Sequence, residues 1–264
     1  MILPGLVSIT FRQLSVTEII TRCNAAKLTG IEWGGDIHVP HGDLPTATAV
    51  AQQTRDAGLH VSTYGSYYRA GHDADLPAES VVATAQKLGA PIIRIWAGHQ
   101  HSVDADADYW HHVAQDCRKI AILAADVGIK IALEWHQKTL TDTAAAATRL
   151  IAAVNHPNLS TFWQPRVKTN VDDNLEDMAA ALPHLIGLHV FNWDIHTAAR
   201  LPLADAASAW NRYLDEVPAT TTCYASLEFV PHDDPELLNQ EAAALHLCLN
   251  RAPFALPPNP LPST

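Results

Sequence analysis

Four polar side chains in the second half of the chain each follow directly on a short apolar run. They are Glu134, Gln164, His189 and Glu228, separated by 30, 25 and 39 residues, and each interval is compatible with one strand–helix unit. If the runs are neighbouring parallel strands, their carboxyl ends bring all four side chains to one mouth. Two carboxylates, an amide oxygen and an imidazole suit Mn²⁺, Mg²⁺ or Co²⁺ better than a thiolate-type zinc site. The four residues therefore predict one divalent metal site.

The alternative for each residue taken singly is structural. An isolated strand-end glutamate is more often a helix-cap partner or half of a loop salt bridge, and a lone strand histidine is usually a core residue. Four such residues on successive strands favour the metal site, because a buried carboxylate without a cation or partner is costly in free energy.

The elements that must position these residues repeat an Ala-rich amphipathic stretch, a glycine and a short apolar run. Gly30, Gly58, Gly89 and Gly128 stand at four such helix–strand joints. A glycine just past a helix end can adopt the left-handed backbone conformation without steric cost. Ser15 and Glu18 have the spacing of a capping box at a helix start.

Eight strands are predicted in all, and 264 residues divided among eight units give about 33 residues each, the size of one βα repeat. Short apolar strands that alternate with helices favour a parallel sheet, and eight units favour a closed barrel. We predict a single-domain α/β fold, a (βα)8 TIM barrel over residues 1–251, followed by a Pro-rich C-terminal tail over residues 252–264. The predicted strands are 7–10, 31–33, 60–64, 92–96, 130–134, 160–163, 188–191 and 225–229.

Composition excludes several classes of protein. The 17 Lys and Arg residues against 28 Asp and Glu give a formal net charge of −11, which argues against a nucleic-acid partner. No apolar run approaches the length of a membrane span, and residues 1–12 lack the features of a secretory signal. The four scattered cysteines indicate free thiols in a reducing compartment, so we expect a cytoplasmic protein. The sequence is compatible with a homo-oligomer.

Three motifs resemble those of a known family. Residues 132–136 and 139–143 resemble the fifth-strand signature of the xylose isomerase-like barrels, the sugar phosphate isomerase/epimerase superfamily, and residues 188–190 and 226–228 resemble its seventh- and eighth-strand signatures. The resemblance implies one divalent ion held by Glu134, position 164, His189 and Glu228. Mn²⁺ is favoured, with Mg²⁺, Co²⁺ and Zn²⁺ as alternatives. Position 164 departs from the pattern, because it holds Gln where the family has Asp.

A divalent ion at such a site can stabilise an enediolate formed next to a carbonyl group. In the resembling epimerases a glutamate pair exchanges the proton, so Glu134 and Glu228 are predicted as acid and base. The leading hypothesis is a metal-dependent isomerase or epimerase that acts on a ketose or related polyol. A lyase, which dehydrates or cleaves an oxidised glycoside or keto-inositol at the same metal site, is the first alternative. A non-catalytic sugar-binding barrel is the second.

Further residues at or just past the predicted strand ends are candidates for contact with a small sugar or polyol. Arg94 can bind an anionic or hydroxyl-rich group or, equally, form an ion pair with Glu32 inside the barrel. The tryptophans can stack on a sugar or plug the barrel mouth. The candidate substrate-binding residues are Arg94, Trp96, His136, Trp163, Arg166 and Trp193.

Overall fold

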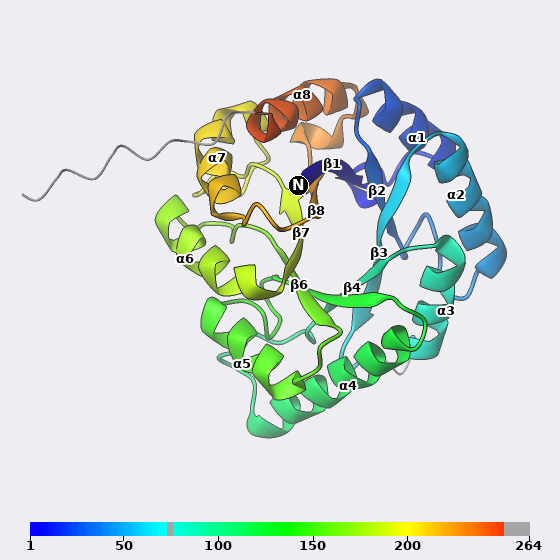
Figure 1. Ribbon diagram of the computed structural model, residues 1–264. Coiled ribbons are helices and arrows are strands. Elements are labelled where there is room, and N and C mark those ends of the chain that lie inside the picture. Colours follow the sequence, from blue (N-terminus) through cyan, green and yellow to red (C-terminus); the bar gives the residue numbers. More distant parts are fainter. Residues whose placement is uncertain (73–75, 251–264) are drawn as a thin grey trace, which may run out of the picture.

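A closed barrel of eight parallel strands forms the centre of the computed structural model, which describes residues 1–72 and 76–250 (Figure 1). Each strand pairs with the next one along the chain, and β8 pairs with β1, so the sheet has no free edge. The prediction of a single (βα)8 barrel is confirmed, whereas the predicted tail lies outside the described residues. The strands are β1 (Ile2–Val7), β2 (Gly30–Gly34), β3 (His60–Arg69), β4 (Ile92–Trp96), β5 (Lys130–Glu134), β6 (Leu159–Trp163), β7 (Leu185–Val190) and β8 (Cys223–Leu227).

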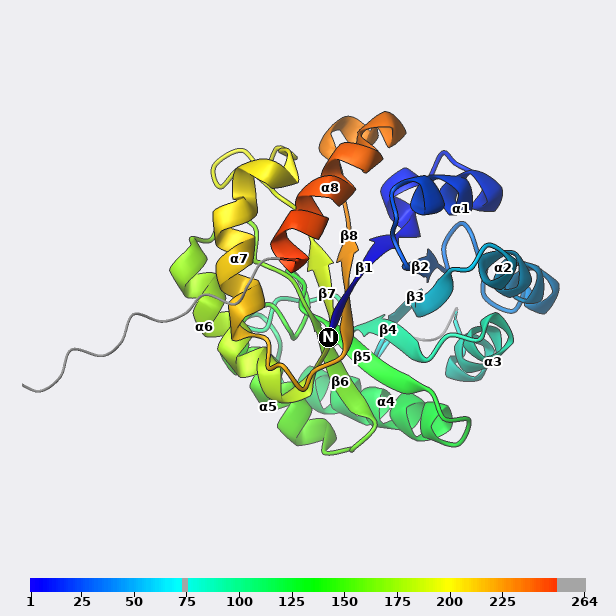
Figure 2. The same cartoon turned by 45° about the horizontal axis from the view of Figure 1, so that its top comes forward.

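Eight α-helices of the described residues surround the strands in chain order, so that α8 closes the ring beside α1 (Figures 1 and 2). The apolar core lies mainly between this ring and the outer face of the barrel, and none of these helices is long and apolar enough to cross a membrane. The helices are α1 (Val16–Ala25), α2 (Leu44–Asp56), α3 (Ala78–Leu88), α4 (Ala107–Ala125), α5 (Ala144–Val154), α6 (Val171–Ala181), α7 (Ala207–Glu216) and α8 (Leu238–Leu249).

Local signals at the helix ends act largely as the sequence indicates. Ser15 and Glu18 form both halves of the capping box that begins α1. Gly58, Gly89 and Gly128 adopt φ values of 73–76° at their helix–strand joints. The prediction for Gly30 is wrong, because this residue is already the first of β2. There a Cβ atom would come within 2.3 Å of the Tyr224 ring, so close packing explains the glycine.

The first strand is also displaced from its predicted place. Residues 8–11 form a short 3₁₀ turn, and β1 runs instead over Ile2–Val7, including Pro4. A proline cannot donate to a sheet ladder, which makes this stretch unpromising as a central strand. Pro4 is tolerated because the residue pairing of β1 with β2 begins only at Gly5, and at Pro4 the bond toward that side uses its carbonyl, which accepts from the Thr29 N–H at 2.9 Å.

Alternation along the strands decides which side chains enter the barrel. In β2 the indole N–H of Trp33 donates to Thr54 Oγ1 of α2 at 3.2 Å, so the neighbouring Glu32 faces the interior. In β6 Phe162 faces inward and lies 5.1 Å, ring to ring, from His189. Successive side chains along a strand point to opposite faces. A shift of one residue along the strand would therefore move a side chain from the barrel interior to the apolar core beneath the helices.

Candidate active site

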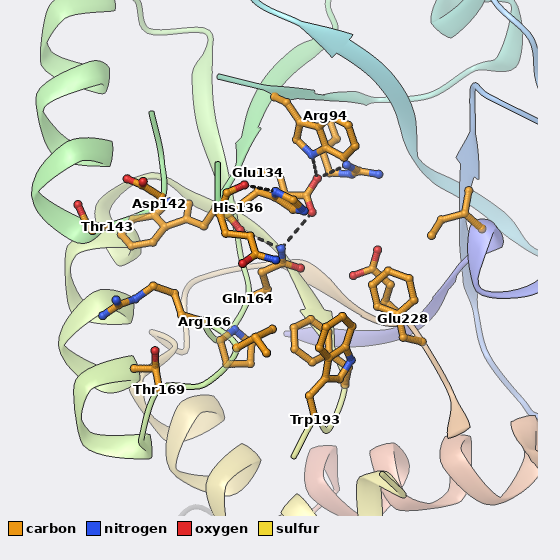
Figure 3. Close-up of a pocket in the computed structure, with 18 of the residues that line it drawn as sticks. Arg94, Glu134, His136, Asp142, Thr143, Gln164, Arg166, Thr169, Trp193 and Glu228 are labelled. Atoms are coloured by element: carbon orange, nitrogen blue, oxygen red, sulfur yellow. Dashed lines mark hydrogen bonds and ion pairs between the residues drawn. The ribbon is translucent and has the colours of Figure 1, made fainter. Parts of the chain in front are cut away.

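The carboxyl ends of the strands open into a pocket of about 510 Å³, lined by strand-end and loop residues from most of the barrel (Figure 3). Glu134 and Glu228 lie on its lining, as do Gln164, Arg94 and Trp96. This is the end of a (βα)8 barrel at which active sites form. The predicted residues therefore converge from strands that are far apart in the sequence.

Glu134 is held by three donors. Its Oε2 accepts hydrogen bonds from the Arg94 guanidinium and from the indole N–H of Trp96, and its Oε1 accepts from Gln164 Nε2 at 3.1 Å. Burial alone would raise the pKa of Glu134, but the charge of Arg94 and the contact with His189 together outweigh it and lower this pKa well below its ordinary value. Glu134 is therefore a fixed, ionised carboxylate.

Glu32 connects the arginine to the histidine in the barrel interior. Its Oε1 accepts from Arg94 Nε at 2.6 Å, and its Oε2 lies 3.1 Å from His189 Nε2. Since an ionised carboxylate only accepts, Nε2 carries the proton, and in the neutral ring Nδ1 holds the free lone pair. The carboxylate–histidine contact thereby fixes the ring with Nδ1 available as a metal ligand.

Three of the four predicted ligands form a compact buried group. Glu134, His189 and Glu228 each offer one ligand atom, and these atoms all lie within 4.8 Å of one another. Nδ1 of His189 is 3.4 Å from Oε2 of Glu228, and both atoms are buried without a hydrogen-bond partner. Gln164 Oε1 is likewise buried and unpartnered, while its amide nitrogen donates to Glu134 and to the Trp135 carbonyl at 2.8 Å.

Electrostatics in this group show a surplus of negative charge. Burial would lower the pKa of His189, but Glu228 and Glu32 outweigh it and raise this pKa to about 10. Burial, with a contribution from Glu134, raises the pKa of Glu228 to about 7 despite the opposing effect of His189. Around His189, three carboxylates, at Glu32, Glu134 and Glu228, face a single guanidinium, that of Arg94.

A divalent cation fits this arrangement. When Nδ1 of His189 binds a metal ion, the ring is neutral. Three ionised carboxylates and one arginine then leave two negative charges, which a divalent ion balances. Unpartnered buried polar atoms are uncommon in folded proteins, and here Nδ1 of His189 and Oε2 of Glu228 lie together. Oxygen donors with one imidazole are typical of Mg²⁺ or Mn²⁺ sites. The residues that would hold the ion are Glu134, His189 and Glu228, and Gln164 Oε1 is available beside them.

Five of the six predicted substrate-binding residues line the pocket, namely Arg94, Trp96, His136, Arg166 and Trp193. Arg94 is at the same time the interior ion-pair partner of Glu32, the alternative weighed for it. The prediction for Trp163 is not supported, because the side chain is fully buried and packs edge-on against Trp210 and Tyr213 of α7. Phe162 and Gln164 face the interior, so the residue between them must face the helices.

Other pocket residues escaped sequence reasoning. Tyr67 lines the pocket with a left-handed backbone at φ 57°, and its hydroxyl accepts from Arg12 Nη2 at 2.5 Å. β3 continues to Arg69, beyond the predicted end at residue 64, and so carries Tyr67 to the mouth. Glu32, which the sequence indicates as a partner of Arg94, also contacts His189, and nothing in the sequence pointed to that second contact.

The fold and the site together define a (βα)8 barrel with a candidate divalent metal centre at its carboxyl mouth. The chain belongs to the xylose isomerase-like TIM barrel family, whose family model matches residues 20–247. The resemblance drawn from the three sequence motifs is confirmed.

Individual relatives include enzymes of two kinds. The chain is 25% identical over 270 residues to a 3-dehydroshikimate dehydratase of Bacillus anthracis, covering 91% of this chain and 95% of the relative. Among solved structures, the probable 3-DHS dehydratase AsbF of Bacillus anthracis has a TM-score of 0.79 at 22% identity, covering 93% of this chain and 98% of that one. A D-psicose 3-epimerase of Clostridium cellulolyticum H10 has a TM-score of 0.67 at 14% identity, covering 94% and 98%.

Proposed function

We propose that this protein is a divalent-metal-dependent dehydratase that removes water from a small cyclic hydroxyketone carboxylate such as 3-dehydroshikimate. The observation that carries the proposal is the buried group of Glu134, His189 and Glu228, whose charge and unpartnered atoms match a divalent ion. The sequence relation to a dehydratase over nearly the full length supports the reaction class. The lyase, the first alternative from the sequence, is thus preferred to the isomerase.

The reaction is a β-elimination. A base removes the proton on the carbon next to the ketone, and the hydroxyl group one carbon further leaves as water. From 3-dehydroshikimate, loss of one water and rearrangement of the remaining hydrogens give 3,4-dihydroxybenzoate with no oxidant. A divalent cation bound at this site would polarise the ketone and stabilise the negative charge that develops on its oxygen.

His136 is the best placed base. It follows Glu134 by two residues, lines the pocket, and lies with its ring centroid 5.2 Å from that of Trp96. Its Nδ1 is 2.6 Å from the Gln137 carbonyl, which only accepts, so Nδ1 carries the proton and Nε2 is the basic nitrogen. His136 therefore combines pocket access with a fixed tautomer.

The two predicted acid–base glutamates have different surroundings. Glu134 already accepts from three donors, so we assign it to holding the cation and keeping Arg94 and Trp96 in place. No hydrogen bond to the Glu228 carboxylate occurs within the described residues. We therefore assign Glu228, on the other side of the mouth, to holding the cation. The proton that His136 removes is returned to the departing hydroxyl, which leaves as water.

Aromatic side chains give the pocket a wall suited to a flat ring. Trp193 lies 5.5 Å from Phe191 and 5.4 Å from Phe229, ring to ring, and all three line the pocket. Such faces pack against a cyclohexene ring and keep water from it. They accommodate the aromatic product equally well.

The test is an assay of metal-stripped protein resupplied with Mn²⁺, Mg²⁺ or Co²⁺ and incubated with 3-dehydroshikimate. We expect a rise in near-ultraviolet absorbance from the aromatic product, only with metal. Glu228→Ala should abolish both product and stoichiometric metal binding. The control Glu236→Ala removes an exposed carboxylate that pairs with Arg22 and should change neither.

An epimerase is the second candidate, because the same proton removal begins both reactions and a sugar 3-epimerase shares the fold. Ketoses in deuterated water distinguish the two. Metal-dependent deuterium uptake into a ketose, with no aromatic product from 3-dehydroshikimate, would replace the dehydratase by the epimerase.

A further inference from the structure

We propose that Arg166 binds the carboxylate of the substrate and makes the pocket selective for anionic hydroxyketones. The inference rests on the proposed function and adds the residue that recognises the substrate's charge. Arg166 lies in the loop between β6 and α6, two residues after Gln164, and lines the same pocket as Glu134 and Glu228. Arg166 is neither a candidate metal ligand nor one of the proposed acid–base residues.

Two buried side chains of α6 hold this arginine. Asn174 Oδ1 accepts from the backbone N–H of Arg166 at 2.8 Å, and Asp177 accepts from its side-chain Nε. Asn174 is 2% exposed and Asp177 is 5% exposed, so both are fixed within the packed layer. The helix thereby orients the guanidinium before any ligand arrives, which reduces the entropy lost on binding.

The outer edge of the guanidinium remains free. Within the described residues neither Nη atom has a partner, and the side chain is 38% exposed. Figure 3 shows Arg166 on the side of the pocket away from Glu228, directed toward Thr143 and Thr169. Two parallel N–H donors in a plane match a carboxylate with two hydrogen bonds.

The other pocket arginines are already engaged. Arg94 gives Nε to Glu32 and Nη1 to Glu134, so two carboxylates use its charge. Arg12 gives one Nη atom to Asp36 and the other to the Tyr67 hydroxyl. Arg166 is thus the pocket arginine of the described residues whose two terminal nitrogens are both available.

The proposal implies one orientation of the substrate in the pocket. In 3-dehydroshikimate the carboxylate and the reacting hydroxyketone lie on opposite sides of a six-membered ring. A carboxylate at Arg166 leaves the ketone end free to face Glu134, Glu228 and the candidate metal centre.

The test compares two probes that differ only in the carboxylate, 3,4-dihydroxybenzoate and catechol. Calorimetry with Mn²⁺-loaded wild-type protein should give a dissociation constant for dihydroxybenzoate at least about tenfold lower than that for catechol, the scale of a charge-assisted hydrogen bond. Arg166→Gln should reduce this ratio to about one to two and leave catechol binding unchanged. Because this substitution leaves the buried Asp177 carboxylate without its ion-pair partner, the double variant Arg166→Gln/Asp177→Asn repeats the test without that charge.

The control Arg212→Gln removes an exposed arginine that pairs with Asp172 of α6, outside the pocket lining, and should keep the wild-type ratio. A ratio that persists in both Arg166 variants would overturn the inference. Equal binding of both probes to wild type would overturn it as well, but would not contradict the proposed dehydratase function. Binding of neither probe to the metal-loaded wild type would overturn the proposed function and this inference together.

Discussion

Glu32, Arg94 and His189, on the strands at the floor of the pocket, are at most 2% exposed, whereas His136 and Arg166 in the loops of its wall are partly open to solvent. The floor residues hold one another by charge across β2, β4 and β7. The wall residues are held by their own loops or by the next helix, as Arg166 is held by α6.

This difference separates two tasks. A change at the floor leaves a buried charge without its partner, so it affects the whole barrel as well as the metal site. A change in the wall alters a contact that the fold does not need. We expect the floor to determine the class of chemistry and stability, and the wall to determine rate and choice of substrate.

The largest effect on stability is expected at the floor. Arg94→Met leaves Glu32 and Glu134 buried without their cation and should lower the free energy of unfolding of the metal-free protein by about 3–5 kcal/mol. Urea denaturation followed by tryptophan fluorescence measures this. Arg212→Met, at an exposed pair, should change it by less than about 0.5 kcal/mol. A loss below about 1 kcal/mol for Arg94→Met would contradict the claim that the floor residues determine stability.

A wall residue should show the opposite pattern. His136→Asn should lower turnover of 3-dehydroshikimate by a factor of about 10²–10⁴, because the base is lost, while stability stays within about 0.5 kcal/mol. Steady-state kinetics and urea denaturation measure the two quantities on the same preparation. Lys138→Ala, an exposed neighbour in the same loop, is the matched control. Full turnover in His136→Asn would mean that another group removes the proton.

Glu32→Gln tests whether the floor orients the metal ligand. The amide can present a donor instead of an acceptor to His189, so the fixed orientation of the ring is lost. Affinity for Mn²⁺, measured by calorimetry, should fall by about 10- to 100-fold. Glu236→Gln at the surface should leave the affinity unchanged. An unaltered affinity in Glu32→Gln would show that packing alone holds the ring.

The smallest effect is expected outside both regions, at the capping box of α1. Hydrogen bonds from Ser15 lower the pKa of Glu18. The stabilisation from this pair is therefore complete above the unfolded pKa of about 4.3 and disappears as pH falls through the lower folded pKa. Ser15→Ala should be slightly less stable at neutral pH and converge with wild type in acid, in denaturation curves recorded at several pH values. A difference independent of pH would assign the effect to the serine hydroxyl alone.

Local patterns in the sequence predicted much of the barrel and its mouth. Apolar runs that end in Glu134, His189 and Glu228 are visible in the sequence because strand burial and strand ends leave a one-dimensional trace. The capping box and three of the four joint glycines are equally local. Two departures also have local causes: Pro4 makes the first strand look unlike a central strand, and the alternation along β6 points Trp163 at α7 and not into the pocket.

The sequence by itself determined the class of fold, the strand-end residues and a carboxylate–imidazole chemistry, since each depends on neighbours within one strand–helix unit. Only the tertiary structure decided the roles within that set. It joined Glu32 to His189 across 157 residues, surrounded Glu134 with donors and left Glu228 without one. Charge and hydrogen bonding act through space, and barrel closure places these groups within a few ångströms of each other.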